Sequence, residues 1–377
     1  MSVPLLVNKL EHIGIRGKPL SLLKSYLSNR KQRVTLSQYV SDDVDVSYGV
    51  PQGSVLGPTL FLIYVNQLCN IQLKNAKVFS YADDTAVVFA GNSWLDVQLA
   101  AEHGLAKLAS WLNGNLLTLN ITKTNFICFS ISNRTQPAND FNIKLHLCGD
   151  GGNLNCNCLT INKVPSTKYL GIIIDQKLSW YLQIDHVANR IRKLSWIFRT
   201  LRHVIPKSIT SKSAHSRNPL NEVYISIVQS VLSYCITVWG GTTKSKFLEL
   251  ERAQRALIKC MYYKELRFPT EQLYKLSSLL SVRKIYITQT ILKTHNSVYY
   301  DEIIEEKRRK FNIIKIPITK TRFASMQFPK RSAQLYNEIN KHVYIYPKNK
   351  HDCKKILTDW IKTLNYHDTE TLLLHVQ

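Results

Sequence analysis

The sequence has few acidic residues and no long apolar run. It holds 26 Asp and Glu against 50 Lys and Arg in 377 residues, a formal net charge of +24 at pH 7. No apolar run reaches the ~20 residues that a membrane-spanning helix needs. The first residues, MSVPLLVNKLEH, lack the basic start and long apolar centre of a secretory signal. We therefore expect an intracellular protein with no membrane partner, located in the nucleus or the cytoplasm.

The cysteines lack the spacing of an ordinary zinc site. Eight of them are scattered along the chain, and an intracellular protein keeps such thiols reduced. His146, Cys148, Cys156 and Cys158 lie close together in HLCGDGGNLNCNC. A Cys-x-Cys pair with a single His departs from the usual ligand spacings. We interpret this stretch as the tip of a Gly- and Asn-rich hairpin, with a metal site as the less favoured alternative.

The positive charge is distributed unevenly. Residues 1–100 are nearly neutral, and almost all of the excess Lys and Arg lies in residues 101–377. Such asymmetry is typical of a protein whose later part binds a polyanion, most often nucleic acid. The alternative is a solvated, solubilising surface.

The hydrophobic pattern predicts an α+β protein that becomes helical toward its C-terminus. Residues 5–30 indicate two helices around a Gly-containing break, residues 55–68 an apolar helix, and residues 95–112 an amphipathic helix. From residue 183 onward the apolar residues recur at helical spacing. We divide the chain into residues 1–180, 181–300, and a basic C-terminal segment of unclear role, 301–377.

The stretch YADDTAVVF places Asp83 and Asp84 side by side in an apolar run. Two adjacent carboxylates repel each other, and burying them is costly unless a cation or hydrogen-bond donors compensate. One interpretation is a plain turn between two strands, because Asp favours turns. The other is a site that holds a cation.

Four motifs in order carry a resemblance to a known family. GVPQGS, YADDT, LN-x-x-KT and KYLG together resemble the palm of reverse transcriptases from non-LTR retrotransposons, especially the jockey-like elements of animals. SVLSYCITVWGG, LELERAQRALI and SSLLSVRKIY resemble that family's connecting and thumb regions. The resemblance implies a partial polymerase palm, an antiparallel sheet with packed helices, followed by a mainly helical, basic thumb or connection. It also implies an RNA template, a DNA primer and their hybrid as partners, and says nothing of oligomeric state.

The resemblance implies catalytic roles for three residues. The family's reaction is a phosphoryl transfer assisted by two Mg²⁺ ions, and Mg²⁺ prefers carboxylate oxygens. Asp83 matches the principal metal ligand, and Asp84 matches its less direct partner. Lys123 matches a lysine that is a candidate to neutralise or protonate the leaving pyrophosphate, although an ordinary surface lysine is the alternative.

The resemblance also implies nucleic-acid contacts. Gln52 and Gly53 match a motif beside the template and the incoming nucleotide, and Tyr81 and Ala82 would shape the approach of the primer, with ordinary packing as the alternative for Tyr81. The segment that grips the primer strand matches Lys168, Tyr169, Leu170 and Gly171. Candidates for contacts with the nucleic-acid backbone are Arg190, Arg192, Lys193, Arg199, Arg252, Arg255 and Lys259.

One expected carboxylate is missing. The family carries a further aspartate in a motif of the type F-D-S-V-P-H, and here Ser2, Val3 and Pro4 resemble its middle while Met1 stands at the aspartate's place. Two carboxylates on one hairpin hold two metal ions poorly. We therefore expect a truncated reverse transcriptase that is inactive or nearly so. The alternatives are a non-catalytic basic nucleic-acid-binding protein and the remnant of a decayed element.

Overall fold

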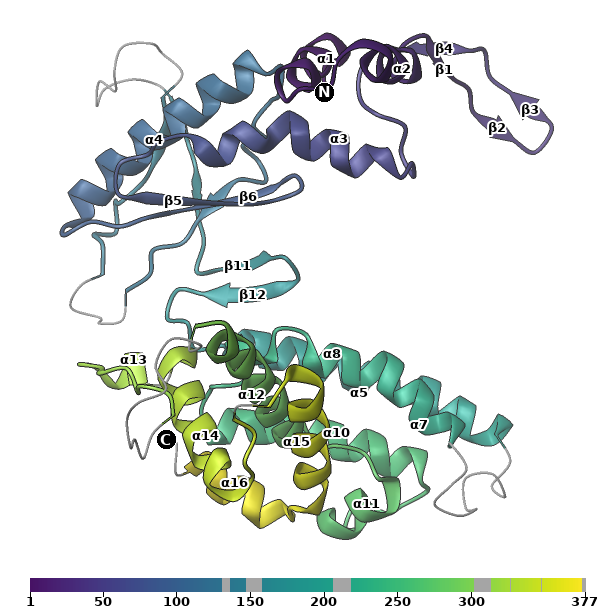
Figure 1. The fold of residues 1–377 in the computed structure, drawn as a ribbon, viewed down its shortest axis with the longest axis vertical. Coiled ribbons are helices and arrows are strands. Elements are labelled where there is room, and N and C mark those ends of the chain that lie inside the picture. The colour runs from purple at the N-terminus through teal and green to yellow at the C-terminus, as the bar shows by residue number, and fades with distance from the viewer. Residues whose placement is uncertain are drawn as a thin grey trace. The chain divides into compact units, whose positions relative to one another are not determined.

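The chain forms two compact units, Met1–Leu170 and Gly171–Gln377 (Figure 1). The computed structural model describes residues 1–130, 136–146, 158–205, 218–301, 313–325, 327–346 and 348–374. Mixed helices and short strands make up the first unit and helices dominate the second, which confirms the α+β class. None of the described helices is both long and apolar enough to span a membrane. The boundaries expected at residues 180 and 300 stay predictions.

Three helices at the start of the first unit pack around one apolar cluster. They are α1 (Val3–His12), α2 (Gly17–Leu27) and α3 (Leu56–Val65), which confirms the two helices and the apolar helix expected from the sequence. Tyr64 on α3 is fully buried, and its hydroxyl donates to the Asn115 carbonyl at 2.5 Å. The buried members of the cluster are Leu6, Leu10, Leu27, Leu60, Tyr64 and Val65.

Short strands complete the first unit. After α2 come β1 (Arg30–Gln32), β2 (Thr35–Leu36), β3 (Tyr39–Val40) and β4 (Val44–Val46), and later β7 (Asn125–Phe126), β8 (Lys144–Leu145), β9 (Leu159–Thr160), β10 (Asn162–Lys163) and β11 (Ser166–Tyr169). β1 pairs with β4, β2 with β3 and β8 with β9, all antiparallel, whereas β7 and β10 pair in parallel. A short 3₁₀ helix, η1 (Asn66–Asn70), follows α3.

The longest strands form the hairpin that carries the paired aspartates. β5 (Ala76–Tyr81) and β6 (Asp84–Phe89) are antiparallel, and Tyr81 pairs with Asp84, so that Ala82 and Asp83 make a two-residue turn. Ala82 has a φ of 52°, in the left-handed region that residues with a Cβ seldom adopt. The structure therefore confirms a turn between two strands at this place, with Asp83 in the turn and Asp84 already in β6.

A long helix, α4 (Trp94–Gly114), follows the hairpin directly. Its start is fixed by a capping box: Ser93 Oγ accepts from Asp96 N, and Asp96 Oδ2 accepts from Ser93 N, both at 3.1 Å. Ala101 on α4 is buried in a small apolar cluster against which Phe89 of β6 packs. The capped helix thus supports the hairpin from one side.

Two long helices form the centre of the second unit, α5 (Tyr181–Val204) and α10 (Lys244–Met261). Their buried residues include Val187, Ile191, Phe198, Leu250, Ala253, Leu257 and Met261, which confirms the apolar faces expected from helical spacing. The remaining elements are β12 (Ile172–Asp175), α7 (Pro219–Tyr224), the π-helix η3 (Ile225–Gln229), α8 (Ser230–Ser233), α9 (Ile236–Trp239), α11 (Thr270–Ser277), α12 (Val282–Asp301), α13 (Arg322–Ser325), α14 (Phe328–His342), α15 (Lys350–Thr363) and α16 (Tyr366–Leu374).

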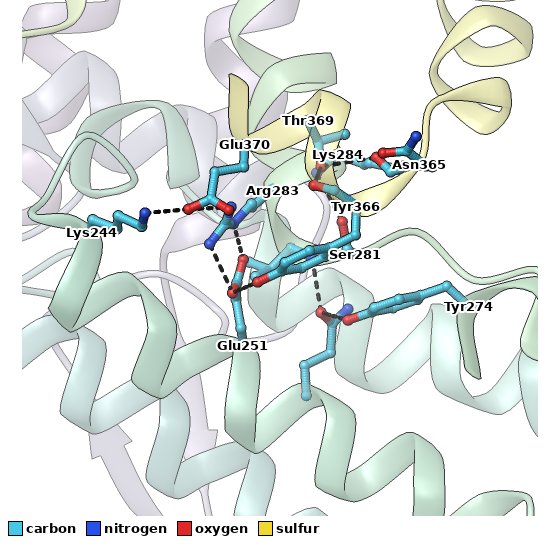
Figure 2. A network of polar contacts seen from close by, with 12 residues as sticks. Lys244, Glu251, Tyr274, Ser281, Arg283, Lys284, Asn365, Tyr366, Thr369 and Glu370 are labelled. Atoms are coloured by element: carbon cyan, nitrogen blue, oxygen red, sulfur yellow. Dashed lines mark hydrogen bonds and ion pairs between the residues drawn. The ribbon is translucent and has the colours of Figure 1, made fainter. Parts of the chain in front are cut away.

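A buried polar network joins α10, α12 and α16 (Figure 2). Glu251 and Arg283 are 1% and 4% exposed and form a two-pronged ion pair, in which Arg283 Nη2 lies 3.1 Å from Glu251 Oε2. Tyr366 Oη donates to the same Oε2 at 2.7 Å. Because each charged group has several partners, the network meets the condition under which buried charges are tolerated.

His295 on α12 is also buried, and both of its ring nitrogens have partners. Nε2 lies 2.8 Å from the Lys348 carbonyl, which can only accept, so Nε2 carries the proton. Nδ1 then accepts from Tyr336 Oη at 2.8 Å. Burial lowers the pKa of His295, and the hydrogen bond to Lys348 opposes that effect only in part. The ring is therefore neutral in the folded protein at pH 7.

The left-handed turn predicts the effect of Ala82→Gly. Glycine relieves the strain of a positive φ, about 1 kcal/mol, which offsets the greater freedom of glycine in the unfolded chain. We expect Ala82→Gly to be at least as stable as the wild type in urea unfolding. Ala86→Gly, within strand β6, is the control and should lose about 0.5–1 kcal/mol. Equal losses at both positions would argue against the positive φ.

His295 predicts a pH-dependent stability. Because its folded pKa lies below the unfolded value of about 6.5, the unfolded state binds more protons as the pH falls. The free energy of unfolding should therefore decrease from pH 7.5 to 5.5, by at most about 1.4 kcal/mol per pH unit from this one group. His295→Gln, which keeps a donor and an acceptor, should flatten that slope in urea midpoints measured across the range. Parallel slopes would assign the pH dependence to other groups.

Candidate active site and nucleic-acid interface

The two carboxylates lie at the exposed tip of the β5–β6 hairpin. Asp83 is the second turn residue and Asp84 is the first residue of β6, and both are exposed. Within the described ranges, neither side chain makes a hydrogen bond or an ion pair. Two adjacent negative charges without a bound cationic side chain favour a cation from solution.

The donor set fits one hard divalent cation with an open coordination sphere. Mg²⁺ is commonly held by one or two carboxylates, with waters and substrate phosphates as its other ligands. Asp83 and Asp84 provide such a pair. Among the described residues, no group of three or more His, Cys, Asp or Glu is placed to hold a metal ion. The chain's own side chains therefore provide a partial site that phosphate oxygens can complete.

Tyr169 of β11 lies beside this hairpin. Its hydroxyl is 3.5 Å from the Phe79 carbonyl oxygen, at the outer limit of a hydrogen bond. Burial raises the pKa of Tyr169, and the nearby Asp84 carboxylate raises it further. The structure thus brings one residue of the expected primer-gripping segment, 168–171, next to the carboxylate pair. That segment makes a tight turn, because Leu170 and Gly171 have φ values of 46° and 81°.

Gln52 and Gly53 lie in the exposed loop before α3. Gly53 has a φ of 76°, which glycine adopts without strain. Ser54 fixes the loop from within: its Oγ donates to the Pro51 carbonyl at 2.7 Å and accepts from Gly57 N at 3.0 Å. The side chain of Gln52 is left available for a ligand.

The first residues of the chain pair with the same loop. The Met1 carbonyl accepts from Gly49 N at 2.8 Å, and Ser2 forms an antiparallel bridge with Tyr48. The guanidinium of Arg30 holds the loop from another side by donating to the Tyr48 and Gly49 carbonyls at 3.1 and 2.8 Å. The position that resembles the family's further aspartate therefore lies beside the loop of Gln52 and Gly53.

Lys123 and Lys168 are exposed side chains. Lys123 sits in a turn that Asn120 fixes, since the Asn120 carbonyl and Oδ1 both accept from Lys123 N at 3.2 Å. No contact within the described residues joins either lysine to Asp83 or Asp84. Their roles stay predictions from the resemblance.

A groove beside α5 lies near the predicted phosphate contacts of the second unit. It encloses about 230 Å³ and is lined by Gly171, Gln183, His186, Val187, Arg190, Ser230, Val231 and Tyr234. His186 and Arg190 are exposed and one helical turn apart, and Tyr234 is 52% exposed. A guanidinium, an imidazole and an aromatic ring on one groove suit the charged backbone and flat bases of a nucleic-acid strand.

Sequence reasoning predicted Arg190 and missed the other polar members of the groove. The four-residue spacing of His186 and Arg190 places them on one face of a helix and was an available signal. Tyr234 comes from a distant apolar segment, and Cys235 after it has a φ of 50°, which breaks the helix between α8 and α9. No local pattern indicates that this break directs Tyr234 toward α5.

The other predicted phosphate contacts differ in their availability. Lys193, Arg199 and Arg252 are exposed. Arg192 is exposed as well and donates to Asn189 Oδ1 at 2.8 Å. Lys259 is half-buried and donates to the Leu266 carbonyl, and burial lowers its pKa, with Arg255 contributing. Lys259 thus stabilises the turn after α10, whereas Lys193, Arg199 and Arg252 make no side-chain hydrogen bond or ion pair within the described residues.

The alternative metal site near residue 150 is tested only in part. Cys148 and Cys156 lie outside the described residues. His146 Nε2 is 3.3 Å from Glu102 Oε2 on α4, and the other oxygen of Glu102 accepts from Lys144 N at 3.0 Å. His146 is therefore engaged with a carboxylate of the fold.

Comparisons with known proteins concern mainly the first part of the chain. Residues 1–174 match the family model "Reverse transcriptase (RNA-dependent DNA polymerase)". In Drosophila melanogaster, the chain is 26% identical over 256 residues to a probable RNA-directed DNA polymerase from transposon BS, covering 64% of this chain and 26% of that protein. It is 23% identical over 314 residues to the corresponding protein of transposon X-element, covering 79% of this chain and 31% of that protein.

A third relative in the same organism is the RNA-directed DNA polymerase from mobile element jockey, 25% identical over 248 residues, or 63% of this chain and 24% of that protein. The chain spans about a quarter to a third of the length of these relatives. Reverse transcriptases bind a nucleic-acid template and primer and use divalent metal ions. Residues 1–174 thus match the reverse transcriptase family, and the relatives that the chain is similar to are RNA-directed DNA polymerases of mobile elements.

Proposed function

We propose that this chain contributes to RNA-templated DNA synthesis through Asp83 and Asp84, which bind Mg²⁺ together with nucleotide phosphates. The observation that carries the proposal is the exposed carboxylate pair at the tip of a tight hairpin, with no cationic side chain bound to it among the described residues. A structural turn gains nothing from two adjacent repelling charges, whereas a divalent cation needs them.

The residues around the pair have separate tasks. The hairpin fixes both carboxylates on rigid backbone, so that they need no rearrangement when a cation arrives. Tyr169, whose pKa is raised by burial and by Asp84, keeps its hydroxyl proton at pH 7 and adds no further negative charge. Bound Mg²⁺ ions would stabilise the charge on the attacking and leaving oxygens of the phosphoryl transfer. Gln52 and the backbone at Gly53 would contact the template or the incoming nucleotide.

The second unit supplies nucleic-acid binding in this proposal. Its groove combines Arg190 and His186 with the ring of Tyr234, and exposed Lys and Arg continue along α5. The partners are an RNA template, a DNA primer and the hybrid they form. Because the pair of carboxylates holds a cation only weakly by itself, we propose that the 377-residue chain alone is inactive or nearly so.

Metal binding tests the role of the pair. Mn²⁺ titrated into isotope-labelled protein should broaden the amide resonances of residues 81–84, with a dissociation constant on the order of 1 mM for so few charged ligands. A deoxynucleoside triphosphate should tighten that binding by supplying phosphate oxygens. Asp83→Asn/Asp84→Asn should abolish the broadening. Asp42→Asn/Asp43→Asn, which neutralises another exposed adjacent pair, is the matched control and should keep it.

Primer extension on an RNA template in Mg²⁺ tests the activity with the same variants. We expect the wild-type chain and Asp83→Asn/Asp84→Asn both to remain at the level of a reaction without protein. Extension by the wild type that the double variant loses would show that the chain obtains a further metal ligand and would overturn the proposal of inactivity. Equal extension by both proteins above the reaction without protein would remove Asp83 and Asp84 from the chemistry.

The groove predicts salt-dependent binding to an RNA–DNA hybrid. Each phosphate neutralised by a cation adds to the slope of log affinity against log salt. Arg190→Gln should weaken binding several-fold and make that slope shallower by about one unit if Arg190 neutralises one phosphate. Lys275→Gln removes an exposed charge of α11 in the same unit and should leave the slope nearly unchanged. Equal effects of the two variants would point to diffuse charge attraction.

A further inference from the structure

A second, smaller cavity of the second unit has a different character. It measures about 40 Å³ and lies between α10, α12, α14 and α16. One buried water needs roughly 10–15 Å³ by this measure, so the cavity has room for a group of a few heavy atoms and none for a nucleobase. Its lining residues are Gly240, Thr242, Lys244, Phe247, Arg283, Tyr286, Arg331, Leu335, Glu370 and Leu373.

Two buried arginines line this cavity, and they differ in how their positive charges are neutralised. Arg283 is matched by Glu251 through two contacts, and its Nη1 lies 3.7 Å from Glu370. Arg331 on α14 is 7% exposed; its Nη1 donates to the Gly241 carbonyl at 2.5 Å, and its guanidinium also forms a hydrogen bond with the Tyr286 side chain. Its Nε has no hydrogen-bond partner within the described residues, and no carboxylate there forms an ion pair with it. A buried guanidinium in that state is costly unless an anion joins it.

The mouth of the cavity carries one cation and one anion. Lys244, 55% exposed at its side chain, forms an ion pair with Glu370, which is 21% exposed (Figure 2). Lys244 and Arg283 hold the pKa of Glu370 below its usual range, the hydrogen bond from Lys244 being the largest cause, so the carboxylate is charged at pH 7. Among the described residues, Arg283, Arg331 and Lys244 line the cavity against Glu370, and Glu251 pairs with Arg283 from outside the lining, so one positive charge is left over.

The guanidinium groups and apolar side chains that line the cavity favour phosphate among small anions. A guanidinium presents its donors in a planar fork that matches phosphate oxygens, and such charge-assisted hydrogen bonds strengthen in a dry environment. Phe247, Leu335 and Leu373 provide that environment. We propose that this cavity binds a single phosphate group, with Arg331 at its base and Lys244 at its mouth. The ligand is inorganic phosphate or the terminal phosphate of a nucleic-acid strand, and the site is separate from Asp83 and Asp84.

Two opposite substitutions at the mouth test the proposal. Phosphate titrated by calorimetry, and as a rise in the melting temperature against chloride at equal ionic strength, should show saturable binding to the wild-type chain. Lys244→Gln should weaken binding at least about fivefold, because it removes a cation and leaves Glu370 to repel the ligand. Glu370→Gln should tighten binding by a similar factor, because it removes the carboxylate that lines the cavity among the described residues.

The matched controls are Lys275→Gln and Glu271→Gln, which change the exposed ion pair of α11 in the same unit. Both should leave phosphate affinity unchanged within about twofold. Absence of saturable binding would overturn the proposal, as would control effects equal to those at the mouth. In either case, water alone would fill the cavity.

Oligonucleotides that differ only in a 5′-phosphate identify the source of the group. If the phosphorylated strand binds more tightly to the wild type and loses that advantage in Lys244→Gln, the ligand is a strand end. If inorganic phosphate binds and the two strands do not differ, the ligand is the free ion. Either result supports the site, and both are independent of primer extension and of metal binding at the hairpin.

Discussion

The buried pair of Glu251 and Arg283 is the interaction on which the second unit depends. It joins α10 to α12, and Tyr366 connects α16 to the same carboxylate. Removing one partner of such a pair leaves an unpaired buried charge, which typically costs about 3–5 kcal/mol. Beside the pair, the side-chain amide of Gln254 makes all four hydrogen bonds that it can form. Its Nε2 donates to Tyr224 Oη and the Leu280 carbonyl, and its Oε1 accepts from Tyr274 Oη and Val282 N. These contacts thus fix α10, α12 and α16, which are distant in sequence, against one another.

Arg331 differs from Arg283 in how its buried charge is neutralised. Where Arg283 is neutralised by Glu251, Arg331 has the Gly241 carbonyl and the Tyr286 hydroxyl as partners, an Nε without a partner, and no ion pair with a carboxylate within the described residues. The same unit therefore contains one arginine whose charge the fold compensates and another whose charge it does not. The first stabilises the packing of helices, and the second is the feature from which we infer a ligand.

The first unit presents the opposite arrangement. Its tightest element is a hairpin that places two carboxylates in water, with backbone strain at Ala82. Local backbone strain persists when the surrounding structure fixes it, and here six paired positions of β5 and β6 do so. The backbone pairing of the hairpin fixes Asp83 and Asp84 in place. Within the described residues, their carboxylate oxygens make no hydrogen bond or ion pair.

Much of this arrangement could be predicted because its signals are local. Two β-prone runs on either side of Asp83 and Asp84 indicated a hairpin, and the spacing of Ile191 and Phe198 indicated which face of α5 is buried. Tyr234 and Arg331 could not be predicted in their roles, since each acquires its surroundings from helices distant in sequence. The order of four motifs indicated the family. No local pattern indicated where Lys123 and Lys168 lie relative to Asp83 and Asp84.

The net charge of +24 overstates the number of cations that a nucleic acid can use. Lys284 Nζ donates to the Leu364 carbonyl at 2.6 Å, and Lys259 stabilises the turn after α10. Arg202 donates to the Cys260 carbonyl at 2.7 Å and lies over the ring of Tyr263. Such groups are committed to the fold and release no counterions on binding. The salt dependence should therefore reflect the exposed cations near the α5 groove, and be smaller than the sequence charge implies.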